Sequence, residues 1–227
     1  MNRPWLSAIV PTWREAEVIA DTVAACNAVA DETIVADAGS PDDTATLAAA
    51  AGARVIAAPR GRGPQQNAGA RAAIGEVLLF VHADTHVPVQ ARAAIASALA
   101  DPTILGGNFK LRFAPATRAA RIYGLANHIR RRALRMYYGD SCIFVRRAVF
   151  DRLGGFPDLP IFEDHAFVRR LEATGRTHYE TSVLVTTSSR RFLNSPIRTL
   201  GTWALLQGLY TCGVPAGRLA RLYRDIR

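Results

Sequence analysis

Short apolar runs alternate with alanine-rich segments over the N-terminal half of the chain, and proline, glycine, threonine or aspartate closes most runs. The runs predict strands at 6–10, 33–36, 54–57 and 77–81. The segments between them predict helices at about 14–30, 40–51, from 64 onward, and 88–100. The second helix would take Ser40 as its N-cap and Pro41 in its first turn. This alternation predicts a parallel sheet with right-handed crossovers, covered on both faces.

The pattern changes after Asp101. Polar and apolar residues alternate over 108–113, which predicts a half-exposed, antiparallel strand. A basic helix is predicted over 115–135, with most of its arginines away from an apolar stripe. That stripe consists of Ile122, Leu125, Ile129, Ala133 and Met136. The remaining elements are strands at 142–145 and 179–185, a helix at 163–174, and two C-terminal helical segments. Without repeats or linkers, we expect one domain, 1–227.

Composition adds a strong positive charge. The net charge is +9, and Lys110 is the only lysine. An arginine-rich genome would explain this bias, and so would an anionic partner such as phosphate, acidic lipid or nucleic acid. Three scattered cysteines predict a reducing, cytoplasmic compartment, with neither zinc site nor disulfide framework. We expect no signal peptide, and no apolar run reaches the ~20 residues of a spanning helix.

Candidate chemistry lies at the carboxyl ends of the predicted parallel strands, which meet at one edge of a sheet. The residues there include carboxylates for a sugar, a base or a metal, and arginines for phosphate. They are Pro11, Thr12, Glu15, Asp37, Gly39, Ser40, Arg60, Gly61, Arg62, His82 and Asp84. Asp84 has a simpler alternative, since it or Thr85 would also suit the cap of the helix near Pro88.

The glycine loop at 61–63 fits no common phosphate motif completely. Gly61-Arg62-Gly63 begins like a dinucleotide fingerprint, but Gln66 stands where the third glycine belongs. No G-x-x-x-x-G-K-[ST] sequence is present, which excludes a P-loop. The start of the helix near Pro64 still favours an anion nearby.

The order of these motifs resembles family 2 glycosyltransferases of GT-A fold. In the first half the matching segments are 9–12 with Glu15, 36–40 with Asp42, 61–62 with 66–70, and His82-Ala83-Asp84. In the second half they are 138–140, 144–147, 154–157 and Glu163-Asp164. The resemblance spans about 6–191, and it is narrower to the compact bacterial subgroup associated with radical-SAM and selenodomain genes.

The resemblance implies an α/β fold with a mostly parallel central sheet, flanking helices, an antiparallel acceptor-side region and C-terminal helices. Residues 1–100 would form the nucleotide-sugar half, 101–190 the acceptor half, and 191–227 the C-terminal helices. The donor, with a UDP-sugar favoured, would lie against Pro11, Thr12, Glu15, Asp37, Gly39, Ser40, Arg62, Asn67, His82, Ala83 and Asp84.

It also implies an inverting transfer to a hydroxyl acceptor. Asp84 would hold Mn²⁺ or Mg²⁺ as the acid of a D-x-D motif, and Asp164 would be the general base. Two departures stand out. His82 replaces the first acid of D-x-D, leaving the metal one carboxylate fewer, so that His82 either joins the metal or binds ribose. Residues 167–170, with Arg169 and Arg170 at the position of a Q-x-x-R-W element, lack its tryptophan, which counts against processive polymer synthesis.

Other readings stay open at this point. A sugar-nucleotide-forming nucleotidyltransferase shares the sheet architecture, but Pro11-Thr12-Trp13-Arg14-Glu15 stands where it usually carries a glycine-rich loop. A non-enzymatic basic module for membranes or nucleic acid would explain the charge but not the acids at strand ends, so we expect no nucleic-acid partner. The basic helix at 118–135 and the tail after Asn194 either pack on the domain, which we favour, pair in a homodimer, or lie on an anionic inner-membrane surface. That surface would suit a lipid-linked acceptor.

Overall fold

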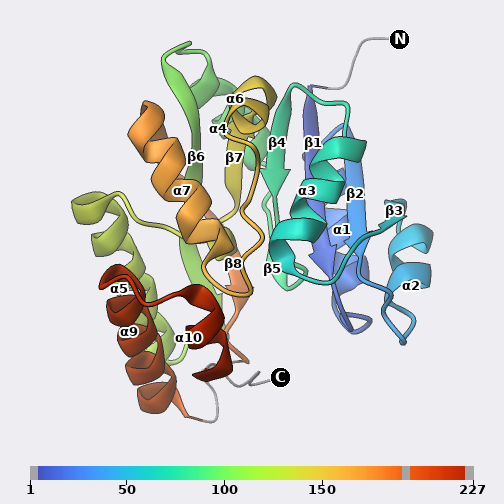
Figure 1. The fold of residues 1–227 in the computed structure, drawn as a ribbon. Coiled ribbons are helices and arrows are strands. Elements are labelled where there is room, and N and C mark those ends of the chain that lie inside the picture. The colour runs from blue at the N-terminus through green and yellow to red at the C-terminus, as the bar shows by residue number, and fades with distance from the viewer. Residues whose placement is uncertain (1–4, 191–194, 223–227) are drawn as a thin grey trace.

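The fold is an α/β sandwich around one twisted sheet, seen in a computed structural model that describes residues 5–190 and 195–222. The eight strands follow the order β3-β2-β1-β4-β7-β6-β8-β5, and helices lie on both faces of the sheet (Figure 1). This is the mixed, mostly parallel architecture with flanking helices that the sequence predicts.

The N-terminal half supplies the parallel part of the sheet. Its strands are β1 (Leu6–Thr12), β2 (Glu32–Asp37), β3 (Arg54–Ala57) and β4 (Val77–Phe80). β1 pairs in parallel with both β2 and β4, and β2 pairs in parallel with β3. The predicted apolar runs are therefore confirmed as strands. The central strands β1 and β4 are almost wholly buried, because helices cover both of their faces.

Two apolar clusters hold the helices to the sheet. Helices α1, α2, α4 and α5 cover one face and helices α3, α6 and α7 cover the other. Their bounds are α1 (Ile19–Asn27), α2 (Thr44–Ala50), α3 (Arg62–Ala72), α4 (Ala91–Leu99), α5 (Arg118–Leu134), α6 (Arg147–Arg152) and α7 (Glu163–Thr174). The second cluster centres on Phe80, Phe150, Phe156 and Phe167, whose rings pack within 4.5–5.7 Å of their neighbours.

The C-terminal half adds mixed pairing. Its strands are β5 (Thr85–His86), β6 (Ile104–Ala114), β7 (Ile143–Arg146) and β8 (Arg176–Ser188). β6 is antiparallel to β7 at Gly106 and Gly107, but residues 108–113 pair in parallel with β8. The prediction of an antiparallel strand is therefore wrong for the pairing with β8. α5, β7 and α7 lie between β6 and β8 in the chain, and they return the chain to the end of the sheet at which β6 begins, so that β8 runs in the same direction as β6.

Two predicted helix starts are wrong. α1 begins at Ile19 rather than near Arg14, because Arg14 adopts a left-handed conformation with φ 55°. α2 begins at Thr44, and Ser40 does not cap it. Instead, the Ser40 hydroxyl donates to Asp37 Oδ1 at 2.6 Å and accepts from the Arg14 N–H at 3.0 Å. Ser40 therefore joins the ends of β1 and β2.

Helix α5 is rotated relative to the prediction. Ile122, Leu125 and Ile129 are 58%, 59% and 55% exposed, whereas Tyr123 and Arg131 are buried. The apolar stripe expected to pack thus faces solvent. A buried polar anchor explains the orientation. The Arg131 guanidinium lies 3.3 Å from Glu172 Oε1 and donates to Asn108 Oδ1 at 2.7 Å and to Thr177 Oγ1 at 2.8 Å. A buried arginine without these partners would be far more costly than three exposed aliphatic chains.

The chain ends in helices α9 (Pro196–Thr211) and α10 (Ala216–Leu222), which pack on one another beside α5 (Figure 1). They confirm the two predicted C-terminal helical segments. Over the described residues, every helix is too short or too polar to cross a bilayer.

Candidate active site

A cavity of about 320 Å³ opens beyond the carboxyl end of β4. Its walls come from the loop after β4, the starts of α3 and α7, and the facing sides of α5 and α9. The polar residues that line it are Arg62, His82, Asp84, Asn127, Arg130, Tyr138, Asp140, Asp164, Thr187, Ser188 and Gln207. Of the residues predicted from the sequence, Arg62, His82, Asp84 and Asp164 therefore meet in one space.

Asp164 is held by two main-chain donors. It lies in the first turn of α7, where its Oδ2 accepts the Gly139 N–H at 2.8 Å and its Oδ1 accepts the His165 N–H at 2.6 Å. Its side chain is buried yet lines the cavity. The two amides fix the orientation of the carboxylate, so its remaining lone pairs are available to a proton donor in the cavity.

Gly139 connects Asp164 to His82. A Cβ on Gly139 would lie 2.5 Å from His82 Nε2, so only glycine lets the imidazole lie this close to the main chain. The same residue donates its N–H to Asp164. The 3-10 turn at Gly139–Ser141 thus sets the relative positions of the His82 ring and the Asp164 carboxylate.

Glu163, next to Asp164, is buried without a hydrogen-bond partner for its Oε1 among the described residues. Burial and then the negative Asp164 raise the pKa of Glu163 to about 7, and Arg62, 3.9 Å away, offsets this only in part. A protonated Glu163 reduces the like-charge repulsion within the pair.

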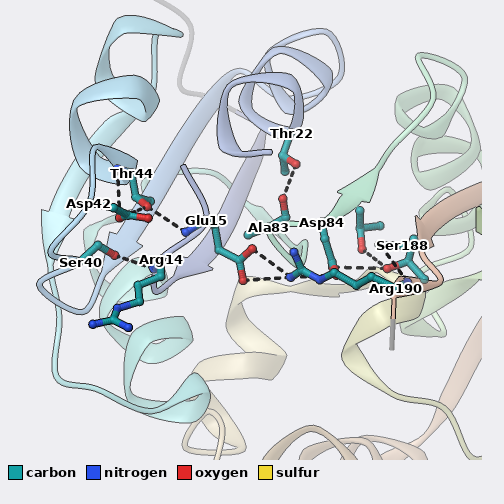
Figure 2. Close-up of polar contacts among 12 residues, drawn as sticks. Arg14, Glu15, Thr22, Ser40, Asp42, Thr44, Ala83, Asp84, Ser188 and Arg190 are labelled. Atoms are coloured by element: carbon teal, nitrogen blue, oxygen red, sulfur yellow. Dashed lines mark hydrogen bonds and ion pairs between the residues drawn. The ribbon is translucent and has the colours of Figure 1, made fainter. Parts of the chain in front are cut away.

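Arg190 bridges the ends of β1 and β4. Its Nη2 donates to Glu15 Oε2 at 3.0 Å and lies 3.4 Å from Asp84 Oδ2, as Figure 2 shows. Burial alone would lower the pKa of Arg190, but the hydrogen bond and charge of Glu15 and the charge of Asp84 raise it. A permanent cation is therefore fixed beside the two carboxylates. Asp84 also accepts from Thr187 Oγ1 at 3.4 Å.

Neither Asp84 nor Thr85 caps a helix. α4 begins only at Ala91, and Thr85 is in β5, where its hydroxyl bonds to Thr187. Ala83 is buried, and its carbonyl accepts from Thr22 Oγ1 at 2.6 Å (Figure 2). These contacts fix the segment before β5, so the Asp84 carboxylate remains at the cavity wall.

Asp37 organises the neighbouring loop. Its carboxylate accepts four hydrogen bonds, from Thr12 Oγ1, the Ser40 hydroxyl, and the N–H groups of Gly39 and Ser40. Gly39 adopts φ 77°, which the turn requires. Pro11 pairs with Ala36 in the register of β1 and β2. A carboxylate has about four acceptor positions. Neighbouring groups of the protein therefore occupy the acceptor positions of Asp37. Contact of Asp37 with a base stays a prediction.

Asn67 points into a different contact from the one expected. Its Nδ2 donates to the Phe156 carbonyl at 2.8 Å, and its Oδ1 accepts the Phe156 N–H at 2.9 Å. Asn67 thus joins α3 to the loop at 154–157, and a role near ribose or diphosphate stays a prediction. Arg170 likewise donates to the carbonyls of Leu153 and Gly155.

Among the carboxylates that line the cavity, Asp84 is the one that the motif order assigns to a divalent ion. Within residues 5–190 and 195–222, no three His, Cys, Asp or Glu side chains gather closely enough to hold a metal. Mg²⁺ at phosphate sites usually takes one or two carboxylates and completes its shell with phosphate oxygens and water. The residues therefore fit an ion that arrives with a diphosphate, and they do not fit one bound by the protein alone.

Sequence reasoning missed Tyr123, Arg130 and Trp203 at the far end of the cavity. There Tyr123 and Trp203 meet edge to face at 6.0 Å between centroids, and the Arg130 guanidinium lies 4.4 Å above the Tyr138 ring. Arg190 was missed as well. Its position just after the strand predicted at 179–185 was the available signal, since the other site residues also follow strand ends.

Comparison with known proteins decides the family. A family model described as glycosyl transferase family 2 matches residues 7–154. The chain belongs to glycosyltransferase family 2. The family predicted from the motif order is thereby confirmed, while the narrower subgroup stays a prediction. A search of curated protein sequences finds no match to this glycosyltransferase.

Solved structures share the GT-A fold of this glycosyltransferase. The mannosyltransferase PcManGT from Pyrobaculum calidifontis, in complex with GDP-Man and Mn²⁺, has a TM-score of 0.70 at 22% identity, over 98% of this chain and 70% of its own. Glucosyl-3-phosphoglycerate synthase from Mycobacterium tuberculosis, with Mn²⁺, UDP-glucose and phosphoglyceric acid, has a TM-score of 0.66 at 20% identity, over 93% of this chain and 81% of its own. S. aureus TarS 1–349 with UDP-GlcNAc has a TM-score of 0.64 at 17% identity, over 82% of this chain and 59% of its own. At these identities the likeness shows the fold.

Proposed function

We propose that this family 2 glycosyltransferase transfers a sugar, with inversion, from a nucleoside-diphosphate sugar to a hydroxyl of an acceptor bound in the cavity. We favour a UDP-sugar donor and membership of the compact radical-SAM and selenodomain-associated subgroup. The observation that carries the proposal is that Asp84 and the main-chain-held Asp164 line the same cavity. The nucleotide sugars in the three structural neighbours support this donor class.

The reaction is one in-line displacement. Asp164 takes the proton of the acceptor hydroxyl, whose oxygen forms the bond to the anomeric carbon from the side opposite the leaving group. The bond from that carbon to the diphosphate oxygen breaks, and its electron pair leaves with the diphosphate. Because there is a single displacement, the anomeric configuration inverts. A positioned base of this kind typically contributes ~10²–10⁴-fold to the rate.

The negative charge of the leaving diphosphate needs a cation nearby. Arg190, fixed between Glu15 and Asp84, supplies one from the protein, and the start of α3 with Arg62 supplies a second positive region. Asp84 would hold Mn²⁺ or Mg²⁺, and such an ion neutralises charge developing on the diphosphate. His82 lies beside Asp84 in the cavity wall, where it would contact the donor.

A donor screen tests the proposal. Melting temperature and sugar-nucleotide hydrolysis are measured for a panel of UDP- and GDP-sugars, each with and without Mn²⁺. We expect at least one donor to raise the melting temperature, because ligands that bind the folded state stabilise it. If none does so under either metal condition, the proposed function is wrong. If a sugar phosphate and a nucleoside triphosphate are instead converted to a nucleotide sugar, the chain is a nucleotidyltransferase.

A further inference from the structure

Exposed apolar side chains concentrate on one group of helices, α5, α9 and α10, which we call the helical lobe. Over the described residues, seven of the eleven large hydrophobic side chains that are exposed lie on these helices. They are Ile122, Leu125, Ile129, Leu134, Ile197, Leu205 and Leu222. Single exposed aliphatic residues are ordinary, but their concentration on three helices is a feature of an interaction site.

The same lobe carries positive charge without any acid. Within their bounds, α5, α9 and α10 contain no Asp or Glu. Arg130 and Arg131 turn inward, to the Tyr138 ring and to Glu172. The other arginines of these helices are exposed: Arg118, Arg121, Arg132, Arg198, Arg218 and Arg221. The surface therefore fits a partner that is both apolar and anionic.

On α5 the two features form one stripe. Arg118, Ile122, Leu125, Ile129 and Arg132 follow one another at spacings of three and four residues, so they share a single helix face. All five side chains are exposed. An apolar row with a cationic residue at each end is compatible with a helix lying in a bilayer interface. The aliphatic chains reach the acyl boundary, and the guanidinium groups meet lipid phosphates.

Pairing with a second copy of the chain explains the lobe less well. A two-fold contact places the same patch on both subunits, so it would bring exposed arginines against arginines with no acid on the lobe to neutralise them. An anionic bilayer meets both the charge and the apolar surface, at about 1 kcal/mol per basic residue near the membrane surface.

We propose that the helical lobe is a docking surface for an anionic phospholipid bilayer, with Ile122, Leu125 and Ile129 inserted at the interface. This docking does not rest on the proposed sugar transfer, because lipid binding is measured without donor or acceptor. Helix α5 packs on the domain, as expected, but it does so through residues such as Ala120 and Tyr123 rather than through its apolar stripe. The exposed stripe is thereby left for the membrane contact.

Vesicle co-sedimentation of the full chain tests the proposal. We expect binding to phosphatidylcholine vesicles that contain phosphatidylglycerol, weaker binding as salt rises, and little binding to phosphatidylcholine alone. A triple variant, Ile122→Gln/Leu125→Gln/Ile129→Gln, should lose affinity on the order of tenfold or more. Its melting temperature should stay close to the wild type, because the three side chains are already more than half exposed.

The matched control is Leu47→Gln/Val89→Gln, which removes exposed aliphatic chains outside the lobe and should bind vesicles as the wild type does. Three results would overturn the proposal. They are no binding to anionic vesicles, equal binding by the triple variant, and equal loss in the control. Sedimentation velocity distinguishes membrane docking from dimerisation. If the wild type is a dimer, the triple variant is a monomer and neither binds vesicles, the stripe is a self-association surface.

Discussion

The loops at the ends of β1, β2 and β4 and the helical lobe are built by different means. The loops are fixed by polar atoms that are almost fully engaged: Asp37 accepts four hydrogen bonds, and Glu15 and Asp84 share Arg190. The lobe meets the cavity through aromatic edges such as Tyr123 against Trp203, and presents aliphatic chains to solvent. Preorganised polar groups suit a charged ligand that must be held in one pose, whereas apolar walls impose fewer directions on what they contact.

The largest effect should come from the carboxylate that lies where the two regions meet. Asp164→Asn removes the base at nearly unchanged side-chain size, so we expect transfer to fall by ~10²–10⁴-fold. The asparagine oxygen can accept only one of the Gly139 and His165 N–H groups, which the two carboxylate oxygens now accept separately. Donor affinity should stay within about twofold. Single-turnover assays and donor titration measure the two quantities, with exposed Asp158→Asn as control. If Asp164→Asn loses donor binding, Asp164 has a role in holding the donor or the structure, like the polar groups of the loops.

The next effect concerns the glycine between His82 and Asp164. In Gly139→Ala, the new Cβ meets His82 Nε2 at 2.5 Å, so the ring or the turn must move. We expect transfer to fall on the order of tenfold or more, since misplaced groups lose rate steeply. Gly124→Ala is the matched control, because the contact nearest to its Cβ is 3.6 Å. Equal activity of the two variants would show that the His82 ring and the turn adjust freely.

A smaller effect is expected from Arg190. Arg190→Gln removes the cation beside Glu15 and Asp84, and we expect donor affinity to fall about tenfold, the scale of a hydrogen bond to a charged group. Calorimetric titration with a nucleoside diphosphate, with and without Mn²⁺, measures it, and exposed Arg169→Gln is the control. Unchanged affinity without metal would leave Arg190 as a purely structural bridge between the ends of β1 and β4.

The smallest effect is on stability and concerns Glu163. Its pKa is raised from 4.5 to about 7 by burial, so between these values the folded state holds a proton that the unfolded state releases. Stability should therefore fall as pH rises through this window. Glu163→Gln should flatten that dependence and raise the melting temperature at alkaline pH by a few degrees. Parallel pH dependences for both proteins would contradict this assignment.

The sequence predicted the strands β1 to β4 and the loops that follow them better than it predicted the helical lobe. Strands β1 to β4 and the loops that bear Asp37 and Asp84 follow from local apolar runs and the residues that end them. The meeting of Asp84 and Asp164 in one cavity was implied by the order of motifs. The strands and loops are short-range signals, which can be found one element at a time, whereas the meeting of the two acids follows only from the family resemblance.

The failures involve tertiary and loop contacts that the local pattern does not reveal. Ser40 looked like a helix cap because Pro41 follows it, but Asp37 and Arg14 compete for its hydroxyl. The rotation of α5 is decided by Arg131 and Glu172, which are 41 positions apart. Arg190 acquires its meaning only beside Glu15 and Asp84. Periodicity within a helix does not reveal a buried ion pair with a distant element.

The contact between α3 and the loop at 154–157 has a mechanical consequence. Asn67 binds the Phe156 main chain at both its amide atoms, and a Cβ on Gly155 would lie 2.5 Å from Asn67 Oδ1. Arg170 of α7 holds the same loop from the other side. Helices α3 and α7 are thereby both bound to the loop at 154–157, which restricts their movement relative to one another. We therefore expect the cavity to widen, when a substrate enters or a product leaves, on the side lined by α9 rather than between α3 and α7.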